Sequence, residues 1–175
     1  MLQMLEGTKN FYLVMEYVES GTLTDAFIRE DDFGEEHACH TIKQVLEGIA
    51  YLHNAGICHR DLKPDNVLVD GVTAEGFPDI KISDAGYATF FREEADTLNC
   101  SLGTRLYLAP ELIKKDKHDE KVDIWSTGVI AFFLLNFGEY PFPGETIEEV
   151  DENIRDTEPD YDDLDHLSPL AVEFI

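Results

Sequence analysis

The sequence predicts a mainly α-helical protein with a few short β-hairpins, α+β overall in fold class. Three observations support this. Residues 35–56 carry apolar side chains at three- and four-residue steps, and the segment after Val122 is apolar on nearly every side. Two short β-rich segments are separated by a loop that contains glycine and proline. With 175 residues, 43% of them hydrophobic, the chain is long enough to bury a core as one domain.

The first half of the chain is predicted from local patterns. Residues 10–18 (NFYLVMEYV) are rich in β-formers and predict a strand. The segment 22–30 predicts a short helix capped by Thr22. A longer helix follows over 35–56 with Gly56 placed to end it. Its apolar residues share one face, and they are Ala38, Ile42, Val45, Leu46, Ile49 and Leu52.

In the second half, residues 66–69 (NVLV) and 79–83 (DIKIS) predict two strands of a hairpin. Residues 85–108 show no sustained period, which is typical of a long functional loop. Four more helices are expected, of which the second is buried and the last is capped by Ser168 with proline next to it. They lie at 109–115, 119–137, 146–156 and 168–175.

The chain is strongly acidic, with 37 acidic residues against 13 basic ones and a net charge of −24. Nucleic acids and anionic membranes both attract positive surfaces, so we expect neither as a partner. Basic peptides or cations suit this charge better. From Glu139 onward there are 13 acidic residues and one basic residue, Arg155. A solubilising face is the favoured interpretation of this segment, and a substrate-steering patch is the alternative.

Three cysteines, Cys39, Cys58 and Cys100, form no CxxC pair, and their odd number argues against a disulfide framework. We therefore expect a cytoplasmic protein, with the nucleus as the alternative. The neighbouring Cys39 and His40 could indicate a metal site, but adjacent helix residues point to different sides, so surface residues are favoured. No signal peptide begins the sequence, and the longest apolar run, 129–135, is shorter than a membrane span.

The motifs HRDLKPDN and SDAG carry side chains suited to chemistry on a phosphate. Asp61 can accept a proton from a hydroxyl, and Lys63 can reach a phosphate as a point charge. Asn66 and Asp84 offer the oxygen ligands that Mg²⁺ prefers. Because the predicted hairpin lies between these two residues, it would return Asp84 to the side of Asn66. Taken alone, Asp61 or Asp84 would more often be a turn or cap residue.

Four motifs in this order resemble the large lobe of a eukaryotic protein kinase: HRDLKPDN (59–66), SDAG (83–86), GTRLYLAPE (103–111) and VDIWSTGV (122–129). Lys63 and Thr104 resemble serine/threonine kinases more than tyrosine kinases, and the segment after Lys121 is most similar to the calcium/calmodulin-dependent group. The resemblance covers nearly the whole chain. It implies that residues 1–18 are a remnant of the small lobe and hinge and that 19–175 are a large lobe truncated at its C-terminal end.

The resemblance implies a role for each motif side chain. Asp61 matches the catalytic base, Lys63 contacts the ATP phosphate, and Asn66 and Asp84 match the Mg²⁺ ligands. The residues at the adenine would be a gatekeeper, two hinge residues that bond through their backbone, and an apolar floor, namely Met15, Glu16, Val18 and Leu68. An ordinary buried strand is the alternative for the hinge residues.

Further positions follow from the same resemblance. Asp123 would anchor the catalytic loop from the buried helix, and Arg60 would reach toward the activation loop. His59 and Trp125 are expected to be packing residues. Glu111 resembles the glutamate that pairs with a later arginine, and no such arginine is present in the sequence.

The sequence departs from the family pattern at three places. Ala85 stands where the family nearly always has phenylalanine, so we expect Asp84 to be held less firmly. The usual phosphorylation position falls on Cys100, with Thr97 and Ser101 as neighbouring substitutes, and we expect little dependence on phosphorylation. Neither a glycine-rich loop nor the lysine of a small lobe can be placed before the hinge.

The motifs and the resemblance that they carry imply a serine/threonine protein kinase that uses ATP and Mg²⁺ and acts on a protein substrate. The acidic charge leads us to expect basic residues near the target hydroxyl. We expect the 175 residues to be a fragment that transfers phosphate negligibly by itself and exposes apolar surface where a small lobe would dock. A non-catalytic pseudokinase or scaffold is the main alternative. A small-molecule kinase is disfavoured because GTRLYLAPE suits an extended peptide substrate.

Overall fold

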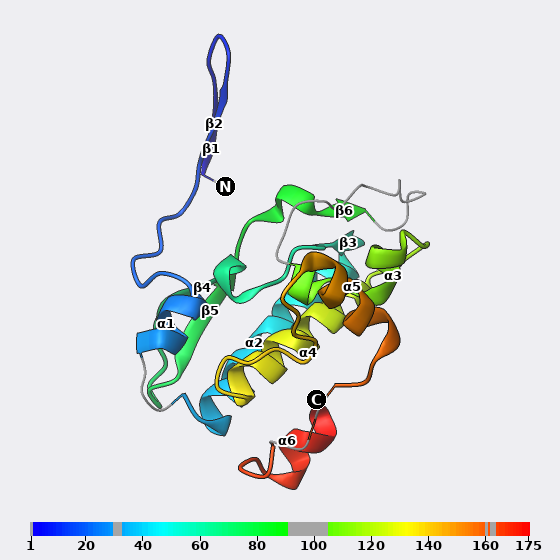
Figure 1. The fold of residues 1–175 in the computed structure, drawn as a ribbon. Coiled ribbons are helices and arrows are strands. Elements are labelled where there is room, and N and C mark those ends of the chain that lie inside the picture. The colour runs from blue at the N-terminus through cyan, green and yellow to red at the C-terminus, as the bar shows by residue number, and fades with distance from the viewer. Residues whose placement is uncertain (1, 30–32, 91–104, 160, 162–163) are drawn as a thin grey trace.

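The computed structural model describes residues 2–29, 33–90, 105–159, 161 and 164–175. Two helices, α2 (Glu35–Asn54) and α4 (Lys121–Leu135), lie side by side at its centre, and short hairpins and shorter helices surround them (Figure 1). This arrangement confirms the expectation of a mainly helical α+β fold. None of the helices in these residues is long and apolar enough to cross a membrane.

Helix α2 buries one face, as its apolar spacing predicts. Ala38, Ile42, Val45 and Ile49 are buried along it, and Leu46 and Leu52 pack against the same core while half-buried. The chain leaves the helix at Gly56, whose φ of 80° lies in the left-handed region that glycine adopts without steric cost. The predicted terminator is therefore confirmed.

Helix α4 is buried on nearly all sides, as expected for its composition. Its hydroxyl side chains are hydrogen-bonded inside the core. Ser126 Oγ donates to the carbonyl of Tyr107 at 2.8 Å, and Thr127 Oγ1 donates to the carbonyl of Asp123 at 2.8 Å. Because these groups have partners, the polar residues do not prevent the helix from lying at the centre of the molecule.

Two short antiparallel strand pairs lie on either side of the motifs. The predicted hairpin is formed by β4 (Val67–Val72) and β5 (Pro78–Ile82), which pair antiparallel with Leu68 opposite Lys81. A second pair joins β3 (Ile57–Cys58) to β6 (Thr89–Phe90). These pairings bring the chain on either side of HRDLKPDN next to the chain on either side of SDAG.

The predicted first helix is α1 (Leu23–Arg29). Thr22 caps it as expected, since Thr22 Oγ1 accepts from the backbone nitrogen of Asp25 at 3.1 Å. The Asp25 carboxylate accepts in return from the backbone nitrogen of Thr22 at 2.8 Å. An isolated bridge between Thr22 and Leu68 attaches the start of this helix to the β4–β5 hairpin.

The N-terminal hairpin departs from the sequence prediction. Its strands are β1 (Gln3–Glu6), which the sequence did not predict, and β2 (Phe11–Val14), so the strand expected over 10–18 ends at Val14. The physical reason is the register: Gln3 pairs with Val14, and among the described residues no strand pairs with those that follow Val14. The hairpin stands away from the helical body (Figure 1), and every residue of its two strands is exposed. Apolar surface is therefore open to solvent on this hairpin.

Of the remaining helices, the last one has its predicted cap at Ser168, and α5 has a cap at Thr146 that was not predicted. Thr146 accepts from the backbone nitrogen of Glu149, and Ser168 accepts from that of Ala171. Three single-turn 3₁₀ helices lie in the described parts of the loops. The elements are α3 (Pro110–Lys114), α5 (Ile147–Asp156), α6 (Pro169–Phe174), η1 (Pro64–Asn66), η2 (Ala85–Tyr87) and η3 (Arg105–Tyr107). The predicted loop over 85–108 therefore contains η2, β6 and η3 in its described part.

Candidate active site

The buried carboxylate of Asp123 fixes the start of the HRD segment. This residue is 0% exposed in the first turn of α4. Its Oδ2 accepts from the backbone nitrogen of His59 at 2.8 Å, and its Oδ1 accepts from that of Arg60 at 2.8 Å. The anchoring contact that the resemblance implied for Asp123 is therefore present. It sets the backbone immediately before Asp61.

His53 completes this anchor, and the sequence analysis missed it. Its Nε2 lies 2.8 Å from Asp123 Oδ2, so the last turn of α2 is tied to the first turn of α4. A signal for it exists in the sequence. His53 lies four residues after Ile49, which places an imidazole on the buried face of the helix.

Two contacts connect the HRD segment to the chain around Asp84. His59 is buried, and its Nε2 lies 3.0 Å from the carbonyl oxygen of Ser83. Arg60 is buried in a left-handed conformation with φ of 66°, and its Nε donates to the carbonyl of Tyr87 at 2.8 Å. Arg60 therefore points to the start of the activation segment, as expected, and His59 both packs and bonds.

The candidate base and its neighbours lie within contact of one another. The Asn66 side-chain nitrogen donates to Asp61 Oδ2 at 2.9 Å and to the Asp61 carbonyl at 2.7 Å. Lys63 Nζ lies 3.6 Å from Asp61 Oδ2. Asp61 and Lys63 are half-buried and Asn66 is buried, so the three side chains form one cluster that is partly shielded from solvent.

Asp84 follows directly after a residue bonded to Asn66. The backbone nitrogen and the hydroxyl of Ser83 both donate to the Asn66 carbonyl, at 2.8 and 3.0 Å. Asp84 itself is left-handed with φ of 58°, and its Oδ1 accepts from the backbone nitrogen of Gly86 at 3.2 Å. The hairpin thus returns Asp84 to the side of Asn66, as predicted. Ala85, where the family has an aromatic ring, is exposed.

The donor set fits a magnesium ion. Asn66 uses its side-chain nitrogen on Asp61, which leaves the amide oxygen available as a ligand. Asp84 supplies an exposed carboxylate. The described residues contain no group of three or more histidine, cysteine, aspartate or glutamate side chains arranged for a metal. Two protein oxygens are nevertheless what Mg²⁺ needs when phosphate oxygens and water complete its shell.

The residues predicted at the adenine are only partly brought together. Lys81 Nζ lies 2.5 Å from Glu16 Oε1 and 2.5 Å from Asp70 Oδ2, and Lys81 is opposite Leu68 in the hairpin. Glu16 and Leu68 are therefore linked through Lys81, a residue that sequence reasoning missed.

Of the other two predicted adenine residues, one is exposed and one is half-buried. Met15 is 65% exposed, and Val18 is half-buried. Both lie outside the strand β2. The alternative of an ordinary buried strand over these residues is therefore wrong.

The segment after the activation loop is held by an ion pair that the sequence did not reveal. Arg105 Nε donates to Asp151 Oδ1 at 2.7 Å, and Arg105 Nη2 donates to Asp151 Oδ2 at 2.6 Å. These bonds raise the pKa of Arg105, so its guanidinium group stays protonated. Trp125 packs as expected, stacked on Phe142 with ring centroids 5.7 Å apart. The residues predicted at Thr97, Cys100, Ser101 and Thr104 lie outside the described residues.

Comparison with known proteins gives a consistent result. The protein kinase domain family matches residues 1–175. Calcium-dependent protein kinase 6 of Plasmodium berghei (strain Anka) is 39% identical over 176 residues, which cover 96% of this chain and 12% of that protein. The SNF1-related protein kinase catalytic subunit alpha KIN12 of Arabidopsis thaliana is 38% identical over 173 residues, with 99% and 33% covered.

A third relative, myosin light chain kinase A of Dictyostelium discoideum, is 34% identical over 154 residues, with 88% of this chain and 51% of that protein covered. The chain thus spans about half the length, or less, of these relatives. The family match covers every residue of the chain, including the four motifs. Hydrogen bonds join HRDLKPDN to VDIWSTGV and to SDAG, and join VDIWSTGV to Tyr107 of GTRLYLAPE. The resemblance drawn from those motifs is therefore confirmed, and the chain belongs to the protein kinase domain family.

Proposed function

We propose that the protein containing this chain transfers the γ-phosphoryl group of ATP to a serine or threonine hydroxyl of another protein. One observation carries the proposal. Asp61 is hydrogen-bonded to Asn66 and lies 3.6 Å from Lys63, while Asp84 follows the residue bonded to Asn66. A base, a cation and two oxygen ligands at one place are what phosphoryl transfer requires of a protein. The names of the relatives support a serine/threonine kinase like those of the calcium/calmodulin-dependent group.

In this proposal Asp61 accepts the proton of the substrate hydroxyl as that oxygen attacks phosphorus. Lys63 lies on the same carboxylate and offsets negative charge that builds on the transferred group. Bound Mg²⁺ neutralises the charge of the β- and γ-phosphates, and Asn66 and Asp84 would hold it. The Asp123 anchor keeps the base in position without contacting substrate.

The nucleotide base would lie against the segment after β2. Glu16 and Val18 would bond the adenine through their backbone, Leu68 would form its floor, and Met15 would stand at its side. The ion pair between Lys81 and Glu16 supports this placement, because it holds the segment beside the hairpin that carries Leu68.

We further propose that the substrate has basic residues near its target hydroxyl. The net charge of −24 favours a basic peptide, and the acidic residues Glu19 and Asp65 are exposed. A peptide-library screen that returned acidic preferences would contradict this. The odd number of cysteines favours the cytoplasm as the compartment, which imaging of the tagged protein would test.

The experiment compares Asp61→Asn with Asp79→Asn in a form of the protein that includes a small lobe with a glycine-rich loop. Both substitutions remove one negative charge, but Asp79 is exposed on β5 and is not one of the candidate site residues. We expect Asp61→Asn to remove nearly all turnover at unchanged nucleotide affinity, and Asp79→Asn to keep turnover. Retained turnover in Asp61→Asn would defeat the assignment. Binding of Mg·ATP without any turnover in the unsubstituted protein would favour the non-catalytic alternative.

A further inference from the structure

The last helix, α6, is attached to the body of the protein mainly by one polar contact. The carboxylate of Glu35, the first residue of α2, accepts from the Ser168 hydroxyl at 2.6 Å and from the Ser168 backbone nitrogen at 2.8 Å. Ser168 is also the cap of α6, because its Oγ accepts from the Ala171 nitrogen at 3.2 Å. One serine thus holds its own helix and joins it to another helix 133 residues earlier in the chain.

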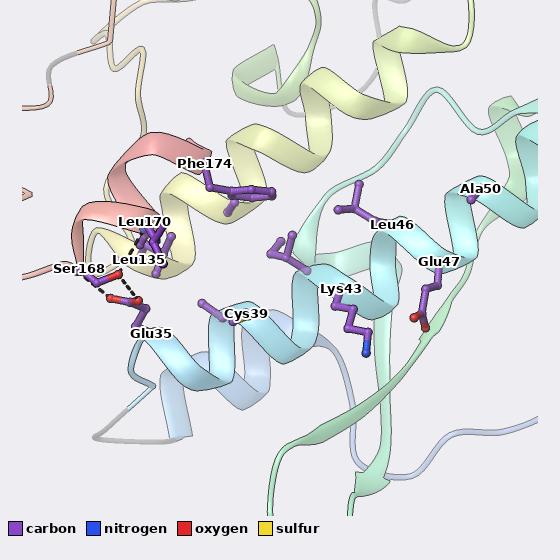
Figure 2. Close-up of a pocket in the computed structure, with 14 residues that line it drawn as sticks. Glu35, Cys39, Lys43, Leu46, Glu47, Ala50, Leu135, Ser168, Leu170 and Phe174 are labelled. Carbon is purple, nitrogen blue, oxygen red and sulfur yellow. Dashed lines mark hydrogen bonds between the residues drawn. The ribbon is translucent and has the colours of Figure 1, made fainter.

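Apart from Ile175 at its C-terminal end, which packs half-buried against the core, α6 adds little apolar packing to this attachment. No residue of α6 is buried, and Leu170 and Phe174 are 77% and 58% exposed. Between α6 and α2 lies a cavity of about 710 Å³, and Figure 2 shows the Glu35–Ser168 bonds at one end of it. An unfilled space of this size means that the two helices make few apolar contacts across it. The residues just before α6 do pack, since Leu164 is buried and Leu167 touches the core.

We propose that Ser168 is a phosphorylation site and that a phosphate there detaches α6 from α2. The proposal does not depend on the proposed kinase activity of this protein. The co-reactants are ATP and a kinase that accepts proline after its target serine. The bond between the γ-phosphorus and the β,γ-bridging oxygen of ATP breaks, the bond from that phosphorus to Ser168 Oγ forms, the hydroxyl proton is released and ADP leaves.

The local backbone suits modification. Ser168 has φ of −66° and ψ of 151°, an extended conformation of the kind that a following proline enforces. Ser168 is half-buried, and Asp165 and His166 before it and Pro169 after it are exposed. Between α5 and α6 the described residues form no helix or strand, and Ser168 directly follows a turn in which the Leu167 nitrogen donates to the Leu164 carbonyl at 3.0 Å.

The charges around the site determine the outcome. Phosphorylation removes the hydroxyl hydrogen that Glu35 accepts and places about two negative charges against its carboxylate. Bonds from Ser168 already lower the pKa of Glu35, so this carboxylate is ionised near neutral pH. The cationic side chain that lines the cavity, Lys43, is two helical turns farther along α2, about 12 Å by the helical rise (Figure 2). Repulsion from Glu35 therefore dominates.

A detached α6 does not persist as a helix, because six residues are too few for a stable helix in water. Amide hydrogen exchange of the last residues of the chain is therefore a direct measure of attachment. We expect phosphorylation of the 175-residue chain to raise the exchange rates of Ala171 and Val172 at least about tenfold, and the increase to shrink at high salt.

The decisive variant is Glu35→Lys. With lysine at this position the phosphate faces a cation, so phosphorylation should slow exchange of α6 where it speeds exchange in the unsubstituted chain. Thr157→Asp is the matched control, since Thr157 lies in the same acidic segment and its hydroxyl donates to the Asn153 carbonyl in its own helix end. It should leave exchange of α6 unchanged.

Three results would overturn the proposal. One is failure of the kinase to modify Ser168 in the intact chain when it modifies a peptide of residues 161–175, as mapped by mass spectrometry. Another is unchanged exchange in the phosphorylated chain. The last is an increase of the same sign in Glu35→Lys as in the unsubstituted chain, which would show that Glu35 does not mediate the effect.

Discussion

Replacing Asp123 with alanine tests the physical basis of the candidate site. The carboxylate is fully buried and accepts from two backbone nitrogens, those of His59 and Arg60, while His53 lies 2.8 Å away. In the alanine variant the two backbone N–H groups stay buried and lose their carboxylate acceptor. Each unsatisfied buried donor costs about 1–3 kcal/mol. Removal of one partner from a buried charged network costs about 3–5 kcal/mol in measured cases.

We therefore expect Asp123→Ala to lower the free energy of unfolding by about 3–5 kcal/mol. This is a large share of the total stability of an ordinary domain, which is about 5–15 kcal/mol. For a chain of this length each kcal/mol lowers Tm by about 2–4 °C. Urea unfolding followed by the fluorescence of Trp125, the single tryptophan, measures the loss as a lower midpoint at constant slope.

Asp119→Ala is the matched control. Asp119 is exposed just before α4, and its Oδ1 accepts from the backbone nitrogen of Lys121 at 2.9 Å. Loss of such a terminal contact costs about 1 kcal/mol. Equal destabilisation by the two substitutions would refute the reasoning, because it would mean that burial of Asp123 and its two backbone donors contributes nothing beyond an exposed helix-end contact.

Three further predictions follow from other contacts. In the native chain a thiol reagent should label Cys39, which is exposed, and not Cys58, which is buried and whose pKa is raised by burial and by the Asp123 carboxylate; equal labelling rates would contradict this burial. Phe142→Ala should cost about 3–5 kcal/mol and shift Trp125 emission to longer wavelength, as the stacked ring is lost; unchanged emission would argue against the stacking. Lys81→Met should weaken nucleotide binding more at low salt than at high salt, measured by calorimetry; a salt-independent change would exclude the Glu16 ion pair as its cause.

Much of the central fold was predictable because its patterns are local. The period of α2 and the all-apolar composition of α4 depend only on residues within each segment, and both helices are present as expected. Strand β1 was not predictable in the same way. All its side chains are exposed, so no burial pattern marks it, and it exists only as the partner of β2.

The candidate site was predictable in its residues and less so in its supports. The hairpin between Asn66 and Asp84 follows from two β-rich segments, so the meeting of the two motifs could be expected. The contacts of His53 with Asp123 and of Arg105 with Asp151 join residues 70 and 46 positions apart. Single-sequence periodicity carries no information on pairings at such distances. The exposed position of Met15 likewise depends on neighbours across the chain.

The Asp123 contacts also bear on the order in which the molecule takes shape. The HRD segment receives its backbone partners from a residue 63 and 64 positions later in the chain. Closing a loop of that length is entropically costly and slow compared with forming a helix. The arrangement around Asp61 can therefore be completed only after α4 has been synthesised and has docked on α2. A nascent chain that has emerged only as far as the β4–β5 hairpin holds every proposed site side chain except Asp84, yet lacks the contact that sets their geometry.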